Sequence, residues 1–445
     1  MIKLILVFIF SVQLLSGQNQ GSPNIIIFLS DDHGAEDAGC YGNPDLQTPV
    51  IDQMAREGMI FRRAYAPVSV CAPSRSSLFT GLYPHKNGCD RNHGKVLPGI
   101  KPLPEYLKPL GYRVALAGKK HIQPEAQFDF EYLELHQVAD FLGDVGDDPF
   151  CLIISMHAPH QPYFNHKGGY GRITPKSWLP DTKATRQYTA AYYDHVNILD
   201  HELGTYLYWV EKYGYSDALQ IYASDHGPAF PFAKWSLYEQ GIRIPLIVKW
   251  PGVISAGSQS QELVSLVDVL PTLVMAAGGQ EPGSLDGRNL SPVFKNESLP
   301  HRNFIYAAYT NQGVQGANEY PIRAIVSHDM KVIVNLHSAN EFHIDRMDTP
   351  DPRSLINSYD VLRSWLEDGS EIIRQRARQH WKRPAVELYD LKKDPGELVN
   401  LAGLPEYYTT ILSMVGQLER WMVEQNDPEI ETIRKILNEQ NDRNK

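Results

Sequence analysis

The apolar run at residues 23–30, Pro-Asn-Ile-Ile-Ile-Phe-Leu-Ser, constrains the fold more than any other stretch of the chain. A continuous apolar run rich in isoleucine is typical of a central parallel strand that is buried on both faces. The run ends at Asp31 and Asp32, and open α/β sheets hold their functional groups at the carboxyl ends of their strands. The sequence therefore predicts an α/β fold with a site at this edge of the sheet.

Further runs extend this pattern along the chain. Strands are expected at residues 61–65, 112–117, 151–156, 219–224 and 244–250, and they alternate with helices expected at 48–58, 102–110, 185–213 and 268–277. Such alternation predicts a mostly parallel sheet with helices on both faces. Short strands at 324–328, 330–335 and 387–391, and a helix at 405–425, follow it. We expect a main domain at 18–320 and a smaller α+β subdomain with an antiparallel sheet at 321–445.

Residues 1–17 combine one Lys, an apolar run and small residues, which predicts a signal peptide. We therefore expect an exported protein, periplasmic or secreted, with no membrane span. The formal net charge of −10 argues against a nucleic-acid partner. A polyanionic substrate would then require positive groups gathered in one pocket, because the local field governs its capture.

Cys71 opens the string Cys-Ala-Pro-Ser-Arg, which is followed by Ser-Ser-Leu-Phe-Thr-Gly. Proline favours the first turn of a helix, so a short helix is expected to open at Pro73 and to end at Gly81. Cys71 would lie at its N-terminus, where free backbone N–H groups favour an anion. A lone cysteine is more often a small buried residue, so the other motifs must decide its role.

The remaining cysteines are Cys40, Cys89 and Cys151. An odd number of cysteines allows at most one disulfide among them. We expect three free buried thiols.

Four side chains with metal-ligand chemistry follow predicted central strands: Asp31, Asp32, Asp225 and His226. Carboxylate oxygens are hard ligands that suit Ca²⁺ or Mg²⁺. His226 either ligates the ion or supports one of its ligands. The sequence predicts a single cation site, and a set built mainly of carboxylates favours Ca²⁺ over Zn²⁺.

The string C-x-P-x-R followed by S-x-x-T-G resembles the signature of the formylglycine-dependent type I sulfatases. The resemblance implies an alkaline-phosphatase-like fold and conversion of Cys71 to 3-oxoalanine (formylglycine) by a maturation enzyme. The hydrated aldehyde is the nucleophile in that family. The resemblance also implies a Ca²⁺ ion, with Mg²⁺ as the alternative, held by Asp31, Asp32, position 71, Asp225 and His226.

The resemblance further implies roles for six residues. Gly118-Lys119-Lys120-His121 matches the Lys-x-His element, in which Lys119 contacts the sulfate and His121 contacts the formylglycine hydroxyl. His157-Ala-Pro-His160 resembles the H-x-P-H stretch, where His160 lies near the substrate and would supply the proton for the leaving atom. His157 would support it. Lys234 matches a second sulfate-contacting cation, and Arg75 completes the positive field.

Segments near the C-terminal end resemble the heparan N-sulfatase (sulfamidase) branch: residues 387–391, Asp394-Pro395, residues 400–402, residues 418–421 and Asp427-Pro428. This resemblance implies a sulfatase acting on a sulfated glycan, either N-sulfoglucosamine of heparan-type chains or an O-sulfated sugar of an algal polysaccharide such as ulvan. Two alternatives stay open. One is a phosphohydrolase of the alkaline phosphatase superfamily, and the other is a glycan-binding protein with a decayed site.

Overall fold

The computed structural model describes residues 22–163, 171, 173–295, 300–354 and 356–443, so the expected signal peptide at 1–17 lies outside the described residues. Its main sheet has the strand order β4-β3-β5-β1-β6-β7-β2-β8, with β9 beside β2. The strands are β1 (Ile25–Ser30), β2 (Met59–Tyr65), β3 (Arg113–Gly118), β4 (Glu131–Leu133), β5 (Phe150–Ser155), β6 (Leu219–Ser224), β7 (Arg243–Lys249), β8 (Ser258–Ser260) and β9 (Val264–Ser265).

Strand β1 lies at the centre of this sheet and is buried along its whole length. It pairs in parallel with β5 on one side and β6 on the other. Ile25 and Ile27 pack into the core on one face, while Ile26 and Phe28 pack into the core on the other, as the period of two in a strand requires. The predicted mostly parallel sheet is confirmed, although β7 runs antiparallel to both β6 and β2.

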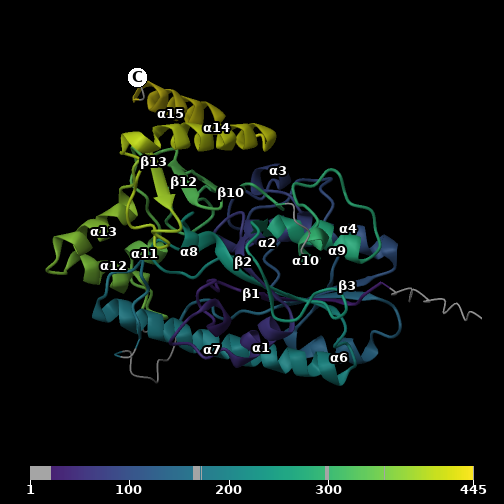
Figure 1. The fold of residues 1–445 in the computed structure, drawn as a ribbon. Helices are drawn as coiled ribbons and strands as arrows, with labels where there is room; N and C mark the ends of the chain where they lie inside the picture. Colours follow the sequence, from purple (N-terminus) through teal and green to yellow (C-terminus); the bar gives the residue numbers. More distant parts are fainter. Residues whose placement is uncertain (1–21, 164–170, 172, 296–299, 355, 444–445) are drawn as a thin grey trace, which may run out of the picture.

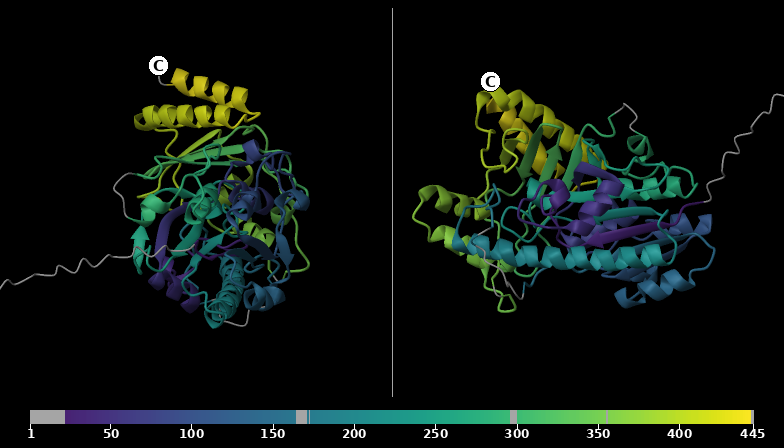
Figure 2. Two further views of the ribbon diagram at one scale, coloured as in Figure 1. Left: turned by 90° about the vertical axis from the view of Figure 1, so that its right-hand side faces the viewer. Right: turned by 60° about the horizontal axis from the view of Figure 1, so that its bottom comes forward.

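Helices cover both faces of the main sheet, as Figures 1 and 2 show. One face carries α2 (Cys71–Thr80), α4 (Leu103–Leu107), α9 (Val269–Ala276) and α10 (Ser291–Phe294). The other carries α1 (Pro49–Glu57), α6 (Val138–Asp144) and the long α7 (Lys183–Lys212). Thr48 precedes α1 as expected. Its hydroxyl does not cap the helix, because it accepts from the Gly39 N–H and donates to Asp52.

A second sheet of four antiparallel strands, in the order β10-β11-β12-β13, confirms the predicted C-terminal antiparallel unit. Its strands are β10 (Ile305–Tyr309), β11 (Ile322–Val326), β12 (Met330–Asn335) and β13 (Val386–Asp390). Strand β10 precedes residue 321, so this sheet starts earlier in the chain than the expected subdomain. Helices α14 (Tyr408–Glu424) and α15 (Ile430–Arg443) cover its outer face (Figure 2).

The shorter elements connect these layers. They are α3 (Pro84–Asn87), α5 (Glu125–Phe128), α8 (Glu239–Ile242), α11 (Asp345–Asp348), α12 (Ser358–Leu366), α13 (Glu371–Trp381) and 3₁₀ turns at Gly39–Tyr41, Lys108–Leu110, Leu135–Gln137, Leu266–Asp268 and Pro405–Tyr407. The sequence did not predict α12 and α13, which pack against the aromatic core between the two sheets through Trp365 and Ala377.

Several groups of buried charges lie within the described part of the chain, and two of them are centred on Lys331 and on Asp268. Lys331 of β12 has no exposed surface, and its Nζ lies 3.2 Å from Glu239 Oε1 and 3.1 Å from Glu397 Oε1. The second group is centred on Asp268, which accepts hydrogen bonds from Arg302 at 3.0 and 3.1 Å. Buried charges of this kind are tolerated only when they are paired.

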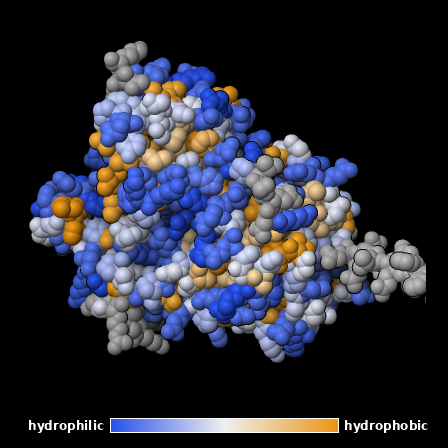
Figure 3. All heavy atoms as spheres, viewed as in Figure 1, coloured by the Kyte–Doolittle hydropathy of each residue, from blue (hydrophilic) through white to orange (hydrophobic). Residues whose placement is uncertain are grey.

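All four cysteines belong to the described residues and are free. Cys89 and Cys151 are buried as expected, whereas Cys40 is half-buried. None of the described helices combines the length and the apolar character that crossing a membrane requires. The face seen in Figure 3 is mostly hydrophilic, with its apolar residues scattered in small groups.

Candidate active site

The carboxyl ends of β1 and β6 bring four of the predicted metal ligands together. The two strands pair in parallel with Ser30 opposite Ser224, so the residues that follow them share one edge of the sheet. Asp32 has a left-handed backbone with φ of 71°, and its N–H donates to Asp225 Oδ1 at 3.2 Å. This conformation is uncommon outside glycine and turns the chain sharply after β1.

Helix α2 presents Cys71 to the same edge. The helix begins at Cys71 instead of at the predicted Pro73, with Val70 as the N-cap residue. Pro73 is tolerated in this first turn because the first N–H groups of a helix have no partner within it. Cys71 Sγ lies 3.3 Å from His226 Nε2 and 3.7 Å from Asp31 Oδ1. Every residue of α2 is buried, so the sulfur is held rigidly.

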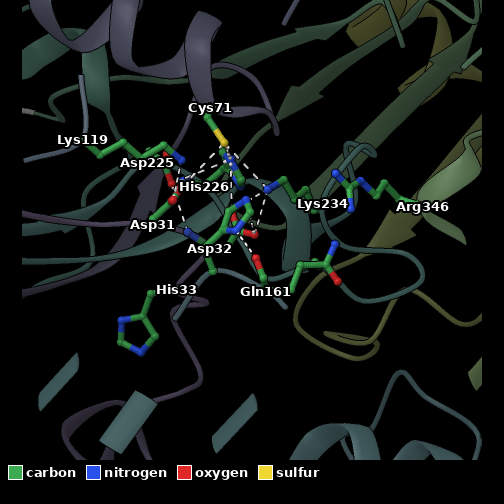
Figure 4. A network of polar contacts seen from close by, with 12 residues as sticks. Asp31, Asp32, His33, Cys71, Lys119, Gln161, Asp225, His226, Lys234 and Arg346 are labelled. Atoms are coloured by element: carbon green, nitrogen blue, oxygen red, sulfur yellow. Dashed lines mark hydrogen bonds and ion pairs between the residues drawn. The ribbon is translucent and has the colours of Figure 1, made fainter. Parts of the chain in front are cut away.

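Two lysines approach the cluster from opposite sides (Figure 4). Lys119, in the turn after β3, forms an ion pair with Asp31. Lys234, in the loop after β6, donates to Asp32 Oδ1 at 2.6 Å and to Oδ2 at 2.8 Å, and its Nζ lies 3.7 Å from Cys71 Sγ. The local positive field that an acidic protein needs for a polyanion is therefore present at this edge.

Arg75 provides the third cation and is fully buried. Its Nε donates to Asp225 Oδ2 at 2.9 Å, and its Nη1 donates to Ser155 Oγ at 2.6 Å. Its Nη2 lies 3.6 Å from Asp31 Oδ1. The guanidinium thus joins the ends of β1, β5 and β6, and it fixes the carboxylates in place.

These charges act on the pKa of the buried acids. Burial alone would raise the pKa of Cys71, but Lys119 and Lys234 hold that pKa well below its usual value. Burial likewise opposes ionisation of Asp31, yet the positive groups around it, with Lys119 first, keep its pKa well below the ordinary value. The site therefore favours an anion at position 71.

The donor set fits a hard divalent cation. Asp31, Cys71, Asp225 and His226 each offer one ligand atom, and these atoms lie within 4.8 Å of one another. His226 Nδ1 lies 2.9 Å from the Gly227 carbonyl oxygen, which can only accept, so Nδ1 carries a proton. Its Nε2 faces Cys71 and the carboxylates. Burial opposes a charge on this ring, but Asp225 and Cys71 raise the pKa of His226 to about 9, so a cation bound there would replace the Nε2 proton.

The predicted histidines occupy different places around this cluster. His160 Nε2 lies 3.9 Å from Asp32 Oδ2, and its side chain is 36% exposed, so it stands between the cluster and solvent. His157 is exposed. His121 is half-buried and hydrogen-bonds His93 through its Nε2 at 3.0 Å. The structure thus brings His160 to the predicted ligands, whereas His121 contacts a residue that the sequence did not indicate.

Sequence reasoning missed several neighbours of the site. Ser155 is the last residue of β5 and lies one residue before the end of the strand predicted at 151–156, and this position was a usable signal. Gln161 follows the His157–His160 stretch and is buried beside it. Arg346 comes from α11, and its guanidinium is directed toward Lys234 in Figure 4. Nothing in the sequence around Arg346 or His93 marks either residue, because the fold brings them there from distant segments.

Comparison with known proteins agrees with this geometry. The sulfatase family model matches residues 23–134 and 134–279, and the model described as N-sulphoglucosamine sulphohydrolase, C-terminal, matches residues 227–365. The chain is 33% identical over 423 residues to an ulvan-active sulfatase of Formosa agariphila, covering 91% of this chain and 81% of that one. It is 31% identical over 468 residues to N-sulphoglucosamine sulphohydrolase of Homo sapiens, covering 91% of each.

A solved structure of a protein in complex with its substrate, D-glucosamine-2-N,6-O-disulfate, has a TM-score of 0.70 at 22% identity. That likeness covers 92% of this chain and 99% of the other, and it supports the fold. A mostly parallel sheet with carboxylates at its strand ends, and with a cysteine at the start of helix α2 beside them, defines a hydrolase of the alkaline-phosphatase-like fold. The chain belongs to the sulfatase family, and it is an enzyme of the sulfatase class. The predicted resemblance to the heparan N-sulfatase branch is confirmed.

Proposed function

We propose that this protein is an exported, formylglycine-dependent and Ca²⁺-dependent sulfatase that removes sulfate from a sulfated polysaccharide or its oligosaccharides. The observation that carries the proposal is the convergence of Cys71 with Asp31, Asp225 and His226, whose ligand atoms lie within 4.8 Å of one another. The positive charges of Lys119 and Lys234 around them create the local electrostatic field that attracts a sulfate group.

The nucleophile of the proposed reaction lies at position 71. Conversion of Cys71 to 3-oxoalanine by a formylglycine-generating enzyme would place a hydrated aldehyde there. Lys119 and Lys234 hold the substrate sulfate beside it and stabilise the charge that develops on the sulfuryl group. Arg75 keeps Asp225 and Asp31 aligned through its three contacts. Fixed charges in a buried site need no reorganisation during the reaction.

Asp31, Asp32, Asp225 and His226, with position 71, would hold the cation, and Ca²⁺ suits this set better than Mg²⁺ because it accepts more ligands in less regular geometry. When bound, the ion would neutralise sulfate charge and polarise the nucleophile.

Departure of the glycan requires a proton at its oxygen or nitrogen. His160 is the residue we assign to this step, since its side chain lies at the boundary between the buried cluster and solvent. Histidine is the side chain that exchanges protons near neutral pH. His157 is exposed, and its carbonyl oxygen accepts from the His160 N–H at 3.0 Å, so it supports the turn that carries His160.

The names of the relatives point to two substrate classes for this chain. One relative is an ulvan-active sulfatase, which favours an O-sulfated algal sugar, and the other is an N-sulphoglucosamine sulphohydrolase, which favours a sulfamate. The two substrates differ in the atom that leaves with the proton from His160. Export to the periplasm or the medium, which the first 17 residues predict, would bring the enzyme to either polysaccharide.

The test uses protein co-expressed with a formylglycine-generating enzyme, with the peptide around residue 71 analysed by mass spectrometry. Sulfate release is then measured on N-sulfated heparan and O-sulfated ulvan oligosaccharides. We expect the mass change of thiol-to-aldehyde conversion and turnover of one class, with no turnover by Cys71→Ala. Undiminished release by Cys71→Ala would refute the proposal. Glycan binding without turnover by fully converted protein would favour the decayed-site alternative, and turnover of phosphate esters alone would favour the phosphohydrolase.

A further inference from the structure

Two histidines beside the site share an uncommon backbone conformation. His93 has φ of 58° and His121 has φ of 47°, both in the left-handed region. Their rings meet through His93 Nδ1 and His121 Nε2 at 3.0 Å, with ring centroids 4.7 Å apart. Non-glycine residues in this region cost energy and cluster where function requires a particular side-chain direction.

The loop that carries His93 is held from two directions. On one side, the Asn92 side-chain oxygen accepts from the N–H of Ala72, the residue after Cys71, at 3.5 Å. On the other, the Asn92 N–H donates to the Gln312 carbonyl at 3.1 Å, and Thr310 donates to the Asp90 carbonyl at 3.0 Å. The loop therefore spans the gap between the start of α2 and the segment that follows β10 of the second sheet.

Gly313 makes this second attachment possible. Its φ is +74°, and a Cβ added there would lie 2.0 Å from the Asn92 carbonyl oxygen, far inside contact distance. Only a glycine allows the two backbones to approach this closely. The position of His93 thus depends on a residue of the distant 310–313 segment.

The pair is also electrostatically close to the nucleophile position. Burial lowers the pKa of His93, His121 lowers it further, and the charge at Cys71 opposes them. Among the described residues, His93 is the one hydrogen-bond partner of the His121 ring. A hydrogen bond between two imidazoles needs one donor and one acceptor, so the bond fixes the orientation of the His121 ring and occupies its Nε2.

We propose that His93 is a positioning residue of this sulfatase, which holds the His121 imidazole in its working orientation and is itself held by the approach of Gly313 to Asn92. The inference rests on the proposed function and on the role that the sulfatase resemblance implies for His121, which is contact with the hydroxyl at position 71. A positioning residue acts on the chemical step more than on substrate binding. Its loss should therefore lower kcat and leave KM nearly unchanged.

The experiment compares His93→Gly, His93→Asn and His136→Ala, all with position 71 converted. Glycine adopts the left-handed backbone freely, so His93→Gly removes the ring without adding strain. Asparagine tolerates the same backbone and carries a polar atom near the place of Nδ1. We expect His93→Gly to lower kcat by roughly 10- to 100-fold, as for a reacting group displaced by about 1 Å. His93→Asn should recover part of this loss, and the exposed control His136→Ala should match the wild type.

Gly313→Ala tests the second half of the inference. It should lower kcat as His93→Gly does, and the double variant should lose less than the product of the two losses, because both changes act through the same ring. If the kcat of the double variant falls by the full product of the two single-variant losses, the role of Gly313 is overturned. Wild-type kcat in His93→Gly, or a loss confined to KM, would overturn the role of His93.

The ¹⁵N resonances of the His121 ring give a readout that does not require turnover. We expect them to shift in His93→Gly and to stay in place in His136→Ala. Unchanged His121 resonances in His93→Gly would refute the inference whatever the activity. If the converted wild type shows no sulfate release while the resonances do shift, the proposed function fails and the hydrogen-bonded pair stands.

Discussion

Lys234 donates to both carboxylate oxygens of Asp32, at 2.6 and 2.8 Å, while its Nζ also lies 3.7 Å from Cys71 Sγ. The lysine is 4% exposed, so water screens its charge little. One side chain from the loop after β6 thus links a predicted metal ligand with the predicted nucleophile. Its position fits a charge that binds sulfate and stabilises the transition state.

Two replacements of Lys234 distinguish the effect of its positive charge on catalysis from the effect of its side-chain shape. Lys234→Ala should lower kcat/KM by about 100- to 1000-fold, the usual effect of removing one fixed donor from a transition state. Lys234→Arg keeps the charge but replaces a compact ammonium with a planar fork, so it should recover only part of the loss. Steady-state kinetics on the substrate turned over by the wild type measure both. Lys234→Ala activity within threefold of the wild type would contradict this role.

Calcium should stabilise the folded protein through Asp225. A ligand that binds only the folded state at about 100 times its Kd adds about 2.7 kcal/mol to the free energy of unfolding. Added Ca²⁺ should therefore raise the Tm of chelator-treated wild type and should not raise that of Asp225→Asn. Asp129→Asn, a change at an exposed carboxylate, is the matched control and should keep the shift. A wild type that shows no shift with Ca²⁺ or Mg²⁺ would exclude a cation at this site.

Asp268 should be a major contributor to the stability of the main domain. It accepts from Arg302 and from the Ser265 and Arg288 N–H groups, and His301 lies 3.1 Å away. Burial opposes its ionisation, but Arg302 and His301 hold its pKa below the ordinary value. Asp268→Asn leaves Arg302 buried and unpaired, and it should cost about 3–5 kcal/mol in urea unfolding.

The depressed pKa of Asp268 also sets the sign of its pH dependence. A folded-state pKa below the unfolded value of 3.8 means that the stabilisation is present above about pH 4 and is lost as the pH falls through the folded pKa. Asp268→Asn should therefore lose the part of the acid sensitivity that this group causes. If the free energy of unfolding of Asp268→Asn fell with decreasing pH as steeply as that of the wild type, this prediction would be contradicted.

Glu397 should act on stability in the opposite direction. Burial raises the pKa of Glu397 from 4.5 to about 7. The positive charge of Lys331 lowers this pKa, but the negative charge of Glu239 raises it, because two carboxylates so close together cannot easily both ionise. The folded state then binds more protons than the unfolded state between pH 4.5 and 7, so this group contributes stability at low pH that is lost as the pH rises through about 7. Glu397→Gln should remove this slope from urea-unfolding measurements at pH 5, 6, 7 and 8. An unchanged slope would show that Glu397 does not titrate there.

The sequence predicted the central strands well because burial on both faces leaves a continuous apolar run, as at β1. It missed β10, whose sequence Ile-Tyr-Ala-Ala-Tyr contains two alanines of low strand propensity, and whose extended form comes from pairing with β11. It also missed α13, which is rich in Arg and Gln and packs only a narrow stripe against the core. In such segments, tertiary contacts and not local sequence preference decide whether a strand or a helix forms.

In the candidate site, too, some residues could be predicted from the sequence and others could not. Asp31, Asp225 and Cys71 could be found because strand ends and a helix start mark them in the sequence. The roles of Lys119, Lys234, His121 and His160 stay predictions, although Lys119, Lys234 and His160 lie beside the predicted metal ligands. His93 and Arg346 had no local signal, since each reaches the site through a fold that joins segments far apart in the chain.

The burial of Cys71 has a consequence for the order of events in the cell. Its side chain is 3% exposed, at the start of a helix whose residues are all buried, so another enzyme cannot reach the thiol in the folded protein. The conversion we propose must then happen on the nascent or unfolded chain, before the sheet and α2 close around it. Folding would compete with maturation, and every molecule that folds first would remain permanently inactive.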